Sequence, residues 1–396
     1  MTAHPVTLGL GLAAAMGVGR FVFTPLLPVM IAQTSMTEQT GALVATANYV
    51  GYLLGALALS GRDAARSRLF VTANALALVA SEVLMLGASS TLAWSALRLV
   101  AGFSSAVLFI ACTGRLHASL TAATASAAEA ARSRGLAFGG VGAGIALTGA
   151  GTLLAGAGAD WRGLWIGSAV LSAALLLPLL LSPAQQPVRE RQPPQQSPAA
   201  TAMPLPPASR RRAWVLLMCL YFAEGLGYIV IGTFLVDAVA AVGPAEEGAG
   251  VAGFAAGGIV WLAVGLAGMV APFLWSLCAA RTGLRAALAL ALALQTAGAL
   301  IPALTGSPGW AVLAALLFGG TFVPITMLAL GIGTALGVPQ SAAKLTAAYG
   351  LGQVLGPLVV IPVLGAGYAA AFAVAGSVLL LATGLSALGL GRAVTP

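Results

Sequence analysis

Twelve segments of this chain are apolar and long enough to cross a lipid bilayer as helices, which takes about twenty residues each. None shows the alternation of polar and apolar residues that is typical of a membrane β-strand. Because backbone polar groups in lipid must be satisfied within the chain, such segments predict helices rather than a barrel. The expected spans are 5–33, 39–60, 68–88, 91–114, 134–158, 161–181, 213–240, 249–279, 284–304, 308–333, 342–364 and 366–391.

The composition supports an all-α integral membrane protein. Hydrophobic residues make up 59% of the chain and charged residues 7%, with a mean hydropathy of +0.99. Soluble domains are about one quarter charged, so a soluble fold of this length would lack a polar surface. The 51 glycines fit the same interpretation, because small residues let membrane helices approach closely. We assign the glycine series Gly51/Gly55 and Gly352/Gly356 to such close helix packing.

The positive charges predict the orientation of the spans. Of the 18 Lys and Arg residues, Arg20 and Arg98 lie inside spans. With both termini in the cytoplasm, Arg162 is the only remaining one on the outer side. Positive residues accumulate on the cytoplasmic side of membrane proteins, so we expect a multi-pass protein of the bacterial inner membrane with both termini cytoplasmic.

A hydrophilic stretch divides the spans into two sets of six. Residues 182–212 are rich in Pro, Gln, Ser and Arg and have almost nothing to bury, which predicts a disordered cytoplasmic linker. The expected organisation is therefore an N-terminal six-helix half over 1–181 and a C-terminal six-helix half over 213–396.

The two halves repeat each other in sequence. Gly19-Arg20-Phe21 in the first span returns 208 residues later as Gly227-Tyr228-Ile229. Further matches keep the same order at similar offsets: Trp94 with Trp310, and Gly140-Val141-Gly142 with Gly350-Leu351-Gly352. Two six-helix halves in parallel, pseudo-two-fold repetition are the architecture of major facilitator superfamily transporters.

Specific motifs resemble one branch of that superfamily. The segments Gly19-Arg20-Phe21-x-Phe23-Thr24-Pro25 and Asn48-Tyr49-x-Gly51-Tyr52 are similar to the YbfB/YjiJ-type branch, and the resemblance covers nearly the whole chain. It implies the twelve-helix transporter fold. Arg98-Leu99-Val100-Ala101-Gly102 resembles the fourth-helix motif whose arginine is linked to proton coupling, and the loop with Arg62, Asp63 and Arg66 resembles a degenerate gating motif.

Arg20 is the leading candidate for binding a solute. A charge in mid-span costs roughly 2.5–3.5 kcal/mol on an insertion scale, so it persists where it is paired, hydrated or functional. With Thr24 one turn away, Arg20 could anchor an anion. The structural alternative is a fixed hydrogen bond between helices.

Glu224 and Glu82 are the carboxyl groups within spans. Glu224 lies near mid-depth, where lack of water favours the neutral acid, and we expect it to exchange a proton together with Arg98. The alternative is a permanent salt bridge to an arginine of the other half. Glu82 and Arg98 lie at similar depth on adjacent spans, which favours a structural ion pair for Glu82.

Three pairs at i, i+4 spacing add polar tips to helix faces, and we place them with Arg20 and Thr24 in a substrate-binding set. They are Asn48 with Tyr52, Glu224 with Tyr228, and Tyr349 with Gln353. Each tyrosine could equally be a packed residue whose hydroxyl bonds a neighbour. Trp261 joins the set as a ring that could stack on a ligand, although packing is the simpler account.

These features predict a secondary transporter that moves a small organic solute by alternating access, coupled to protons. Arg20 favours an organic anion or an amphipathic carboxylate. The alternatives are a proton-driven efflux pump for hydrophobic cations and a non-transporting membrane sensor. We expect a monomer with no cofactor, no metal site, no nucleic-acid partner and no enzymatic activity. No P-loop occurs, so ATP is not the expected energy source.

Overall fold

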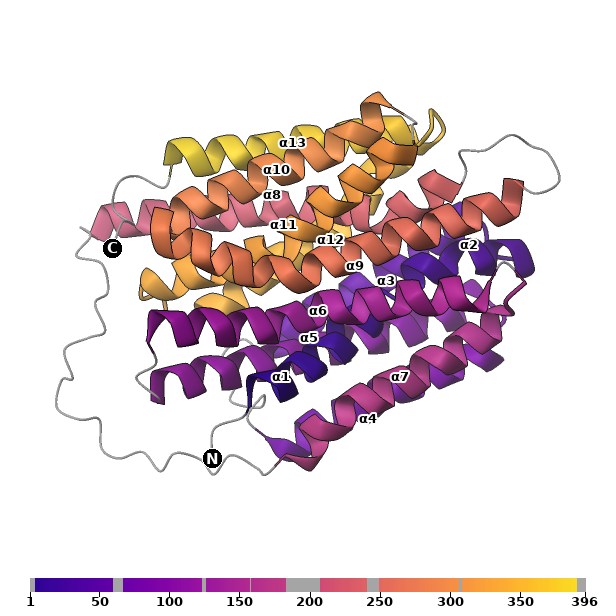
Figure 1. Cartoon of the computed structure of the whole chain (residues 1–396), viewed down its shortest axis with the longest axis horizontal. Coiled ribbons are helices and arrows are strands. Elements are labelled where there is room, and N and C mark those ends of the chain that lie inside the picture. Colours follow the sequence, from indigo (N-terminus) through magenta and orange to yellow (C-terminus); the bar gives the residue numbers. More distant parts are fainter. Residues whose placement is uncertain are drawn as a thin grey trace.

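The computed structural model describes residues 4–59, 67–122, 126–156, 158–182, 207–240, 249–305 and 308–389, and these parts are helical and contain no strand (Figure 1). The first six spans are built from α1 (Pro5–Leu12), η1 (Ala13–Val18), α2 (Phe23–Gln33), α3 (Glu38–Leu59), α4 (Arg68–Leu84), η3 (Met85–Gly87), α5 (Thr91–Ala122), α6 (Ala127–Ala155) and α7 (Trp161–Leu181). The second six are α8 (Pro207–Ala240), α9 (Ala249–Thr282), α10 (Leu284–Leu304), α11 (Pro308–Ala335), α12 (Ser341–Leu364) and α13 (Tyr368–Gly389).

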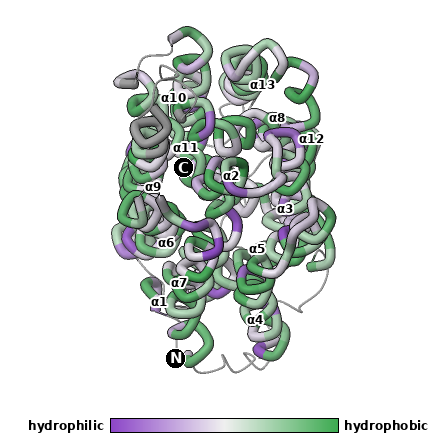
Figure 2. Tube along the Cα trace, turned by 90° about the vertical axis from the view of Figure 1, so that its right-hand side faces the viewer, coloured by the Kyte–Doolittle hydropathy of each residue, from purple (hydrophilic) through white to green (hydrophobic). Residues whose placement is uncertain are grey.

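The twelve expected spans are confirmed. Twelve helices, with the first formed by α1, η1 and α2 together, are long and apolar enough to cross a membrane. The outward faces carry large apolar side chains, for example Leu154, which is 88% exposed, and the trace is predominantly hydrophobic on its outside (Figure 2). Exposed apolar surface of this extent is rare on soluble monomers, and lipid is the medium that suits it.

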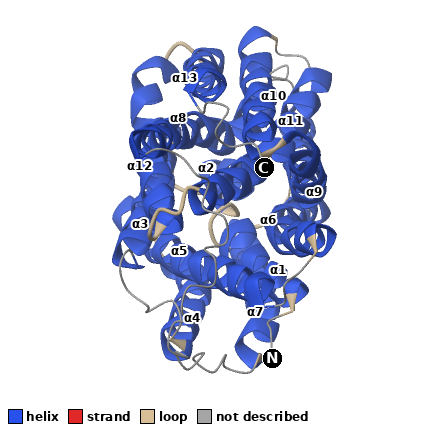
Figure 3. Cartoon of the chain, turned by 90° about the vertical axis from the view of Figure 1, so that its left-hand side faces the viewer, coloured by secondary structure: helices blue, strands red, loops and turns tan. Residues whose placement is uncertain are grey.

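The helices form two groups that meet along two flanks. In the view along the helix axes, α3 and α12 face each other on one flank, α6 and α9 on the opposite flank, and α2 lies between them (Figures 2 and 3). Helices α1–α7 make up one group and α8–α13 the other. Several polar residues of the spans, among them Arg20 and Gln353, lie in the space between the groups.

Three helix boundaries differ clearly from the expectation: α5 ends at Ala122 rather than 114, and α6 and α8 begin earlier than expected. The linker prediction is wrong for residues 207–212, which form the first turns of α8. Pro207 is favourable at the first position of this helix, because the backbone N–H that proline lacks would have no partner within the helix there. Residues 183–206 lie outside the described part of the chain. Helix α6 begins at Ala127 rather than 134 because Ser126 and Glu129 form a capping box.

The first span is not one continuous α-helix. Residues 13–18 are π-helical and residues 19–22 form turns, so the backbone changes its winding where Arg20 stands. Pro25 contributes to this break, because it has no N–H for the Phe21 carbonyl, which instead accepts from the Thr24 N–H at 3.2 Å. Such π-bulges are rare and are frequently found at functional sites.

Glycines let the helices approach closely at the seams. The expected packing role of Gly51, Gly55, Gly352 and Gly356 is confirmed, since a Cβ on any of them would overlap the backbone of the neighbouring helix. A longer seam joins the two halves, where α6 and α9 run antiparallel. There Gly142 meets the Gly268–Met269 backbone and Gly265 meets Ala146.

Candidate functional site

Arg20 lies between the two halves at the break in the first span. Its side chain is 2% exposed, and Nη2 donates a hydrogen bond to Oε1 of Gln353 on α12. The guanidinium carbon lies 4.0 Å from the centroid of the Tyr52 ring, a cation–π contact on α3. The Nε and Nη1 atoms have no hydrogen-bond partner. A permanently charged group therefore stands in the middle of the molecule with donors to spare.

Gln353 connects Arg20 to the first helix of the other half. Its Nε2 donates to the Tyr228 hydroxyl, while its Oε1 accepts from Arg20. Arg20 and Tyr228 are counterparts in the sequence repeat, 208 residues apart. The two equivalent positions of the halves thus share one amide, which forms a polar bridge across the centre.

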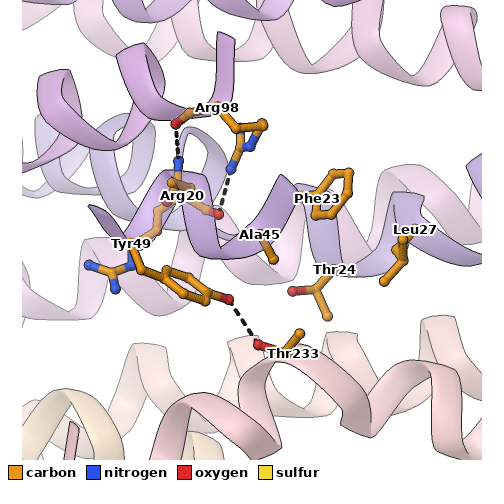
Figure 4. A pocket seen from close by; sticks show the side chains of 9 residues that line it. Arg20, Phe23, Thr24, Leu27, Ala45, Tyr49, Arg98 and Thr233 are labelled. Carbon is orange, nitrogen blue, oxygen red and sulfur yellow. Dashed lines mark hydrogen bonds between the residues drawn. The ribbon is translucent and has the colours of Figure 1, made fainter. Parts of the chain in front are cut away.

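Arg98 supports the same turn from α5. Its Nη2 donates to the Arg20 carbonyl oxygen at 2.8 Å, and its own carbonyl accepts from Asn48 Nδ2 at 3.0 Å (Figure 4). The Nε and Nη1 atoms of Arg98 and the Oδ1 atom of Asn48 are buried without partners. Arg98 therefore holds the interrupted backbone at Arg20 and has unused donors of its own.

A small polar cavity lies on one side of Arg20, with a volume of about 10 Å³, which is room for one water molecule. Phe23, Leu27 and Ala45 supply its apolar lining. Its polar lining is Arg20, Thr24, Asn48, Tyr49, Arg98 and Thr233 (Figure 4). These residues include two arginines and no carboxylate, so the electrostatic character of this cavity suits an anion.

An aromatic cavity lies on the other side of Arg20, with a volume of about 20 Å³, which is room for one or two water molecules. Each half supplies four rings to its lining. The first half contributes Phe21, Tyr52, Phe109 and Phe138, and the second contributes Tyr221, Tyr228, Phe322 and Tyr349. The cavity lies toward the beginnings of three spans. Its lining includes Met16, Tyr221 and Thr346, which precede Arg20, Tyr228 and Gln353 on the same spans. It therefore faces the end at which α1, α8 and α12 begin.

The halves are joined by hydrogen bonds beside the polar cavity. Thr24 Oγ1 donates to the Gly232 carbonyl at 3.0 Å, and the hydroxyls of Tyr49 and Thr233 lie 2.9 Å apart. These contacts connect α2 and α3 to α8 on the side toward which α2 and α8 end. They close the space between the halves at that level.

Glu224 is buried apart from both cavities. It is fully buried on α8, where Oε1 accepts from Gln295 Nε2 at 3.1 Å and Oε2 has no partner. It is not among the lining residues of either cavity. The salt-bridge alternative is not realised in this conformation, because Arg20 bonds Gln353 and Glu224 bonds Gln295.

Glu82 is likewise buried, and it contacts a hydroxyl. Oε1 accepts from Ser172 Oγ at 3.0 Å, whereas Oε2 has no hydrogen-bond partner. Among the described residues, the expected ion pair with an arginine is not formed by contact. The Oε2 atom of Glu82 and the Nε and Nη1 atoms of Arg98 are not joined by a hydrogen bond.

Trp261 stands apart from the other predicted site residues. Trp261 Nε1 donates to Thr148 Oγ1 at 3.3 Å, and its ring meets the Phe21 ring edge-on at 6.3 Å. Trp261 lines neither cavity, and these contacts are those of a packing residue at the α6–α9 seam. Arg62, Asp63 and Arg66 lie outside the described residues.

Seven of the residues predicted for the substrate site line the cavities or form the bridge between them: Arg20, Thr24, Asn48, Tyr52, Tyr228, Tyr349 and Gln353. It missed Tyr49 and Thr233, which close the polar cavity, and Tyr221, which lines the aromatic one. Tyr49 stands inside a motif already singled out, and Thr233 stands next to the counterpart of Thr24. Both signals were present in the repeat.

The fold and the central polar bridge define a helical, multi-pass membrane transporter of the major facilitator type. A family model described as "Uncharacterised MFS-type transporter YbfB" matches residues 12–387, and the chain belongs to this family. The fold resembles the crystal structure of a mutant of the nucleoside transporter NupG, with a TM-score of 0.66 and 13% sequence identity, over 96% of this chain and 99% of that one. No curated protein matches the sequence.

Proposed function

We propose that this transporter carries a small organic anion across the bacterial inner membrane by alternating access, with Arg20 as the anion anchor. The observation that carries the proposal is the environment of Arg20. Its guanidinium is buried between the halves, has two unpartnered nitrogens and lines a cavity without a carboxylate. A buried charge of this kind is costly unless a ligand or water completes its hydrogen bonds.

The mechanism follows from the partners of Arg20. A solute carboxylate would bind Nε and Nη1 and could replace the Gln353 amide at Nη2, which loosens the bridge between the halves. Opening toward the polar cavity requires the Thr24–Gly232 and Tyr49–Thr233 hydrogen bonds to break. Binding energy at Arg20 thereby favours one relative position of the halves over the other.

Proton coupling is assigned to Glu224, with Arg98 as a supporting residue. Glu224 is a fully buried carboxyl group whose hydrogen-bond partner is one neutral amide, and such surroundings favour the protonated acid. Its charge can change without breaking an ion pair. A proton carried with a monocarboxylate would make the transported combination electrically neutral.

The second candidate is efflux of hydrophobic cations. The eight aromatic rings of the aromatic cavity favour it, because ring faces attract cations. The absence of a carboxylate among the residues lining the two described cavities is the observation that favours an anion instead.

A flux assay on reconstituted vesicles separates these proposals. With a pH gradient imposed, hexanoate and benzoate represent anions and tetraphenylphosphonium represents cations, and protein-free vesicles give the leak. We expect uptake of an organic anion that Arg20→Ala weakens by about 1.5–3 kcal/mol of affinity. Arg162→Ala, a change at an exposed arginine near the outer helix ends, should leave affinity unchanged. Cation flux without anion flux would establish the efflux alternative and overturn the anion proposal.

The orientation and assembly are also proposals. The distribution of positive residues supports cytoplasmic termini, and it places the aromatic cavity toward the cytoplasm and the polar cavity toward the outside. We assign residues 183–206 to a cytoplasmic connection between the halves and the loop with Arg62, Asp63 and Arg66 to gating. One chain contains both halves, so a monomer is sufficient for alternating access.

A further inference from the structure

Glu224 and Gln295 form a buried pair in which each group has one oxygen left over. Both side chains are 0% exposed, and Nε2 of Gln295 on α10 donates to Oε1 of Glu224 on α8 at 3.1 Å. The second oxygen of each group, Oε2 of Glu224 and Oε1 of Gln295, is buried without a hydrogen-bond partner. With an ionised carboxyl group both of these oxygens are acceptors, so neither can satisfy the other.

One proton satisfies both atoms. A protonated carboxyl group has an O–H donor beside its carbonyl oxygen, and a primary amide has N–H donors beside its own. With the proton on Oε2, Glu224 donates to Oε1 of Gln295, while Nε2 of Gln295 donates to Oε1 of Glu224. The acid and the amide then form a ring of two hydrogen bonds. Because buried polar atoms are nearly always hydrogen-bonded, the protonated acid is the form that suits this pair.

The groups around Glu224 favour the same form. The titratable groups that interact with it are three tyrosines, Tyr221 and Tyr228 on α8 and Tyr349 on α12, and tyrosines are neutral at physiological pH. Two of the hydroxyls are engaged elsewhere, since Tyr221 bonds Thr326 and Tyr228 accepts from Gln353. In the described part of the chain, no cation contacts Glu224.

Glu82 provides a comparison within the same molecule. Its Oε1 accepts from the Ser172 hydroxyl and its Oε2 has no partner, as in Glu224. Glu82, however, interacts electrostatically with Arg98, whose Nε and Nη1 atoms are unpartnered donors. A cation therefore complements Glu82, whereas an amide with a free carbonyl oxygen complements Glu224.

We propose that Gln295 holds the transported proton on Glu224 by forming a cyclic acid–amide pair with it in the conformation that is closed beside the polar cavity. This inference rests on the proposed proton coupling and adds Gln295 as a positioning residue. Release transfers the proton from Oε2 to water and leaves a carboxylate, to which Nε2 of Gln295 still donates. Glu224 stands one turn before Tyr228, so a change at the pair lies close to the central bridge.

Infrared difference spectroscopy on the purified full-length protein tests the pair, because a carboxylic acid and a carboxylate absorb at different frequencies. At neutral pH, we expect wild type minus Glu224→Gln to contain the carbonyl band of a protonated acid, and Glu82→Gln to retain that band. Gln295→Met, which keeps the length of the side chain, should move the band to higher frequency because the acid carbonyl loses its N–H donor. Thr296→Val is the matched control, since Thr296 is the neighbouring buried polar residue and bonds Leu292 and Thr383.

Two spectroscopic results would overturn the inference. One is a carboxylate signal in place of the acid band, which the wild type and Glu224→Gln show even if Gln295→Met does not fold. The other is an acid band that Gln295→Met leaves unmoved, because the acid would then have another partner.

Transport in vesicles separates this inference from the proposed function. For whichever of hexanoate and benzoate the wild type moves, Gln295→Met should lower accumulation in a pH gradient about tenfold, the effect of one lost hydrogen bond on the proton equilibrium. Exchange of the same acid without a gradient should persist. If Gln295→Met accumulates normally and Glu224→Gln does not, Gln295 holds no proton while proton coupling stands. If the wild type moves neither acid, the proposed anion transport fails and the infrared bands alone decide the pair.

Discussion

Thr24 on α2 donates a 3.0 Å hydrogen bond to the carbonyl of Gly232 on α8, and these two residues are counterparts in the two halves of the chain. Their separation of 208 residues equals the offset between Arg20 and Tyr228. The pseudo-two-fold axis therefore passes close to this contact, where equivalent turns of the first span of each half meet.

Replacing Thr24 with valine should weaken closure beside the polar cavity. The change keeps the shape and removes the donor, so about 0.5–1.5 kcal/mol of closing energy is lost. A cysteine at Ala45, which lines this cavity, should then react faster with an impermeant maleimide in a variant without Cys112, Cys219 and Cys278. Thr46→Val is the control, because Thr46 bonds Ala42 within its own helix. Equal labelling of both variants would show that the Thr24 contact does not hold the halves.

Gln353→Glu tests the central bridge. A carboxylate in place of the amide would bind Arg20 with a charge-assisted hydrogen bond, which is about twice as strong as a neutral one, and would compete with the solute. Solute affinity should fall about tenfold or more while the protein remains folded. Gln353→Ala should instead lower the free energy of unfolding by about 1–3 kcal/mol, because buried donors lose their partner. Solute binding measures the effect of Gln353→Glu, and thermal unfolding measures the effect of Gln353→Ala. Unchanged solute affinity in Gln353→Glu would show that the side chain at position 353 does not compete with the solute for Arg20.

Glu224→Gln tests proton coupling. Glutamine mimics the protonated acid and can still bond Gln295, so solute binding should persist while accumulation driven by a pH gradient is lost. Glu82→Gln is the matched control, since Glu82 is the other buried carboxyl group and bonds Ser172. We expect that control to accumulate solute like the wild type. Normal accumulation by Glu224→Gln, measured in vesicles, would remove Glu224 from the coupling step.

The seam between α6 and α9 predicts a large difference between two glycines of one helix. A Cβ on Gly142 would overlap the backbone of Gly268 and Met269, so Gly142→Ala should destabilise the protein by about 1–3 kcal/mol. Gly151 has open space around it, and Gly151→Ala should be neutral or stabilising by up to about 1 kcal/mol. Thermal unfolding in detergent compares the two. Equal stability of both variants would show that the halves are not packed closely along this seam.

Reporter fusions test the orientation. Fusions after Gln195 and after Arg392 should report the cytoplasm, and a fusion near Glu247 should report the outside, because positive residues concentrate on one side of the spans. An outside signal at either of the first two positions would contradict the assignment of the aromatic cavity to the cytoplasmic side.

The twelve spans could be predicted because bilayer thickness and backbone hydrogen bonding leave few solutions for such a sequence. The transporter family was predicted from the resemblance of its motifs, such as the one around Arg20. The seam glycines of α3 and α12 were also readable from their spacing. Boundaries beyond the bilayer were less well determined, since the first turns of α8 lie in the stretch that composition assigns to the linker. Composition measures what a segment can bury, and a capped polar helix buries little.

The candidate site was only partly predictable. Arg20 and Gln353 were identified from charge and polarity, but their contact depends on how the two halves fit together, which no local pattern encodes. The contacts of Glu82 needed the same information: similar depth places it near Arg98, and side-chain direction brings its Oε1 atom to the Ser172 hydroxyl. The π-helical turn before Arg20 needed the combined effect of Gly17, Gly19 and Pro25, which act through neighbouring backbone.

The α6–α9 seam also bears on how the molecule is made. Gly142 and Gly265 lie in different halves, so at about 5–20 residues per second the ribosome finishes α6 on the order of ten seconds before α9 emerges. During that interval the seam face of α6 meets lipid, and its glycines offer lipid tails almost no side chain to pack against. This face of the first half stays incomplete until α9 arrives, so the seam between α6 and α9 forms late in synthesis.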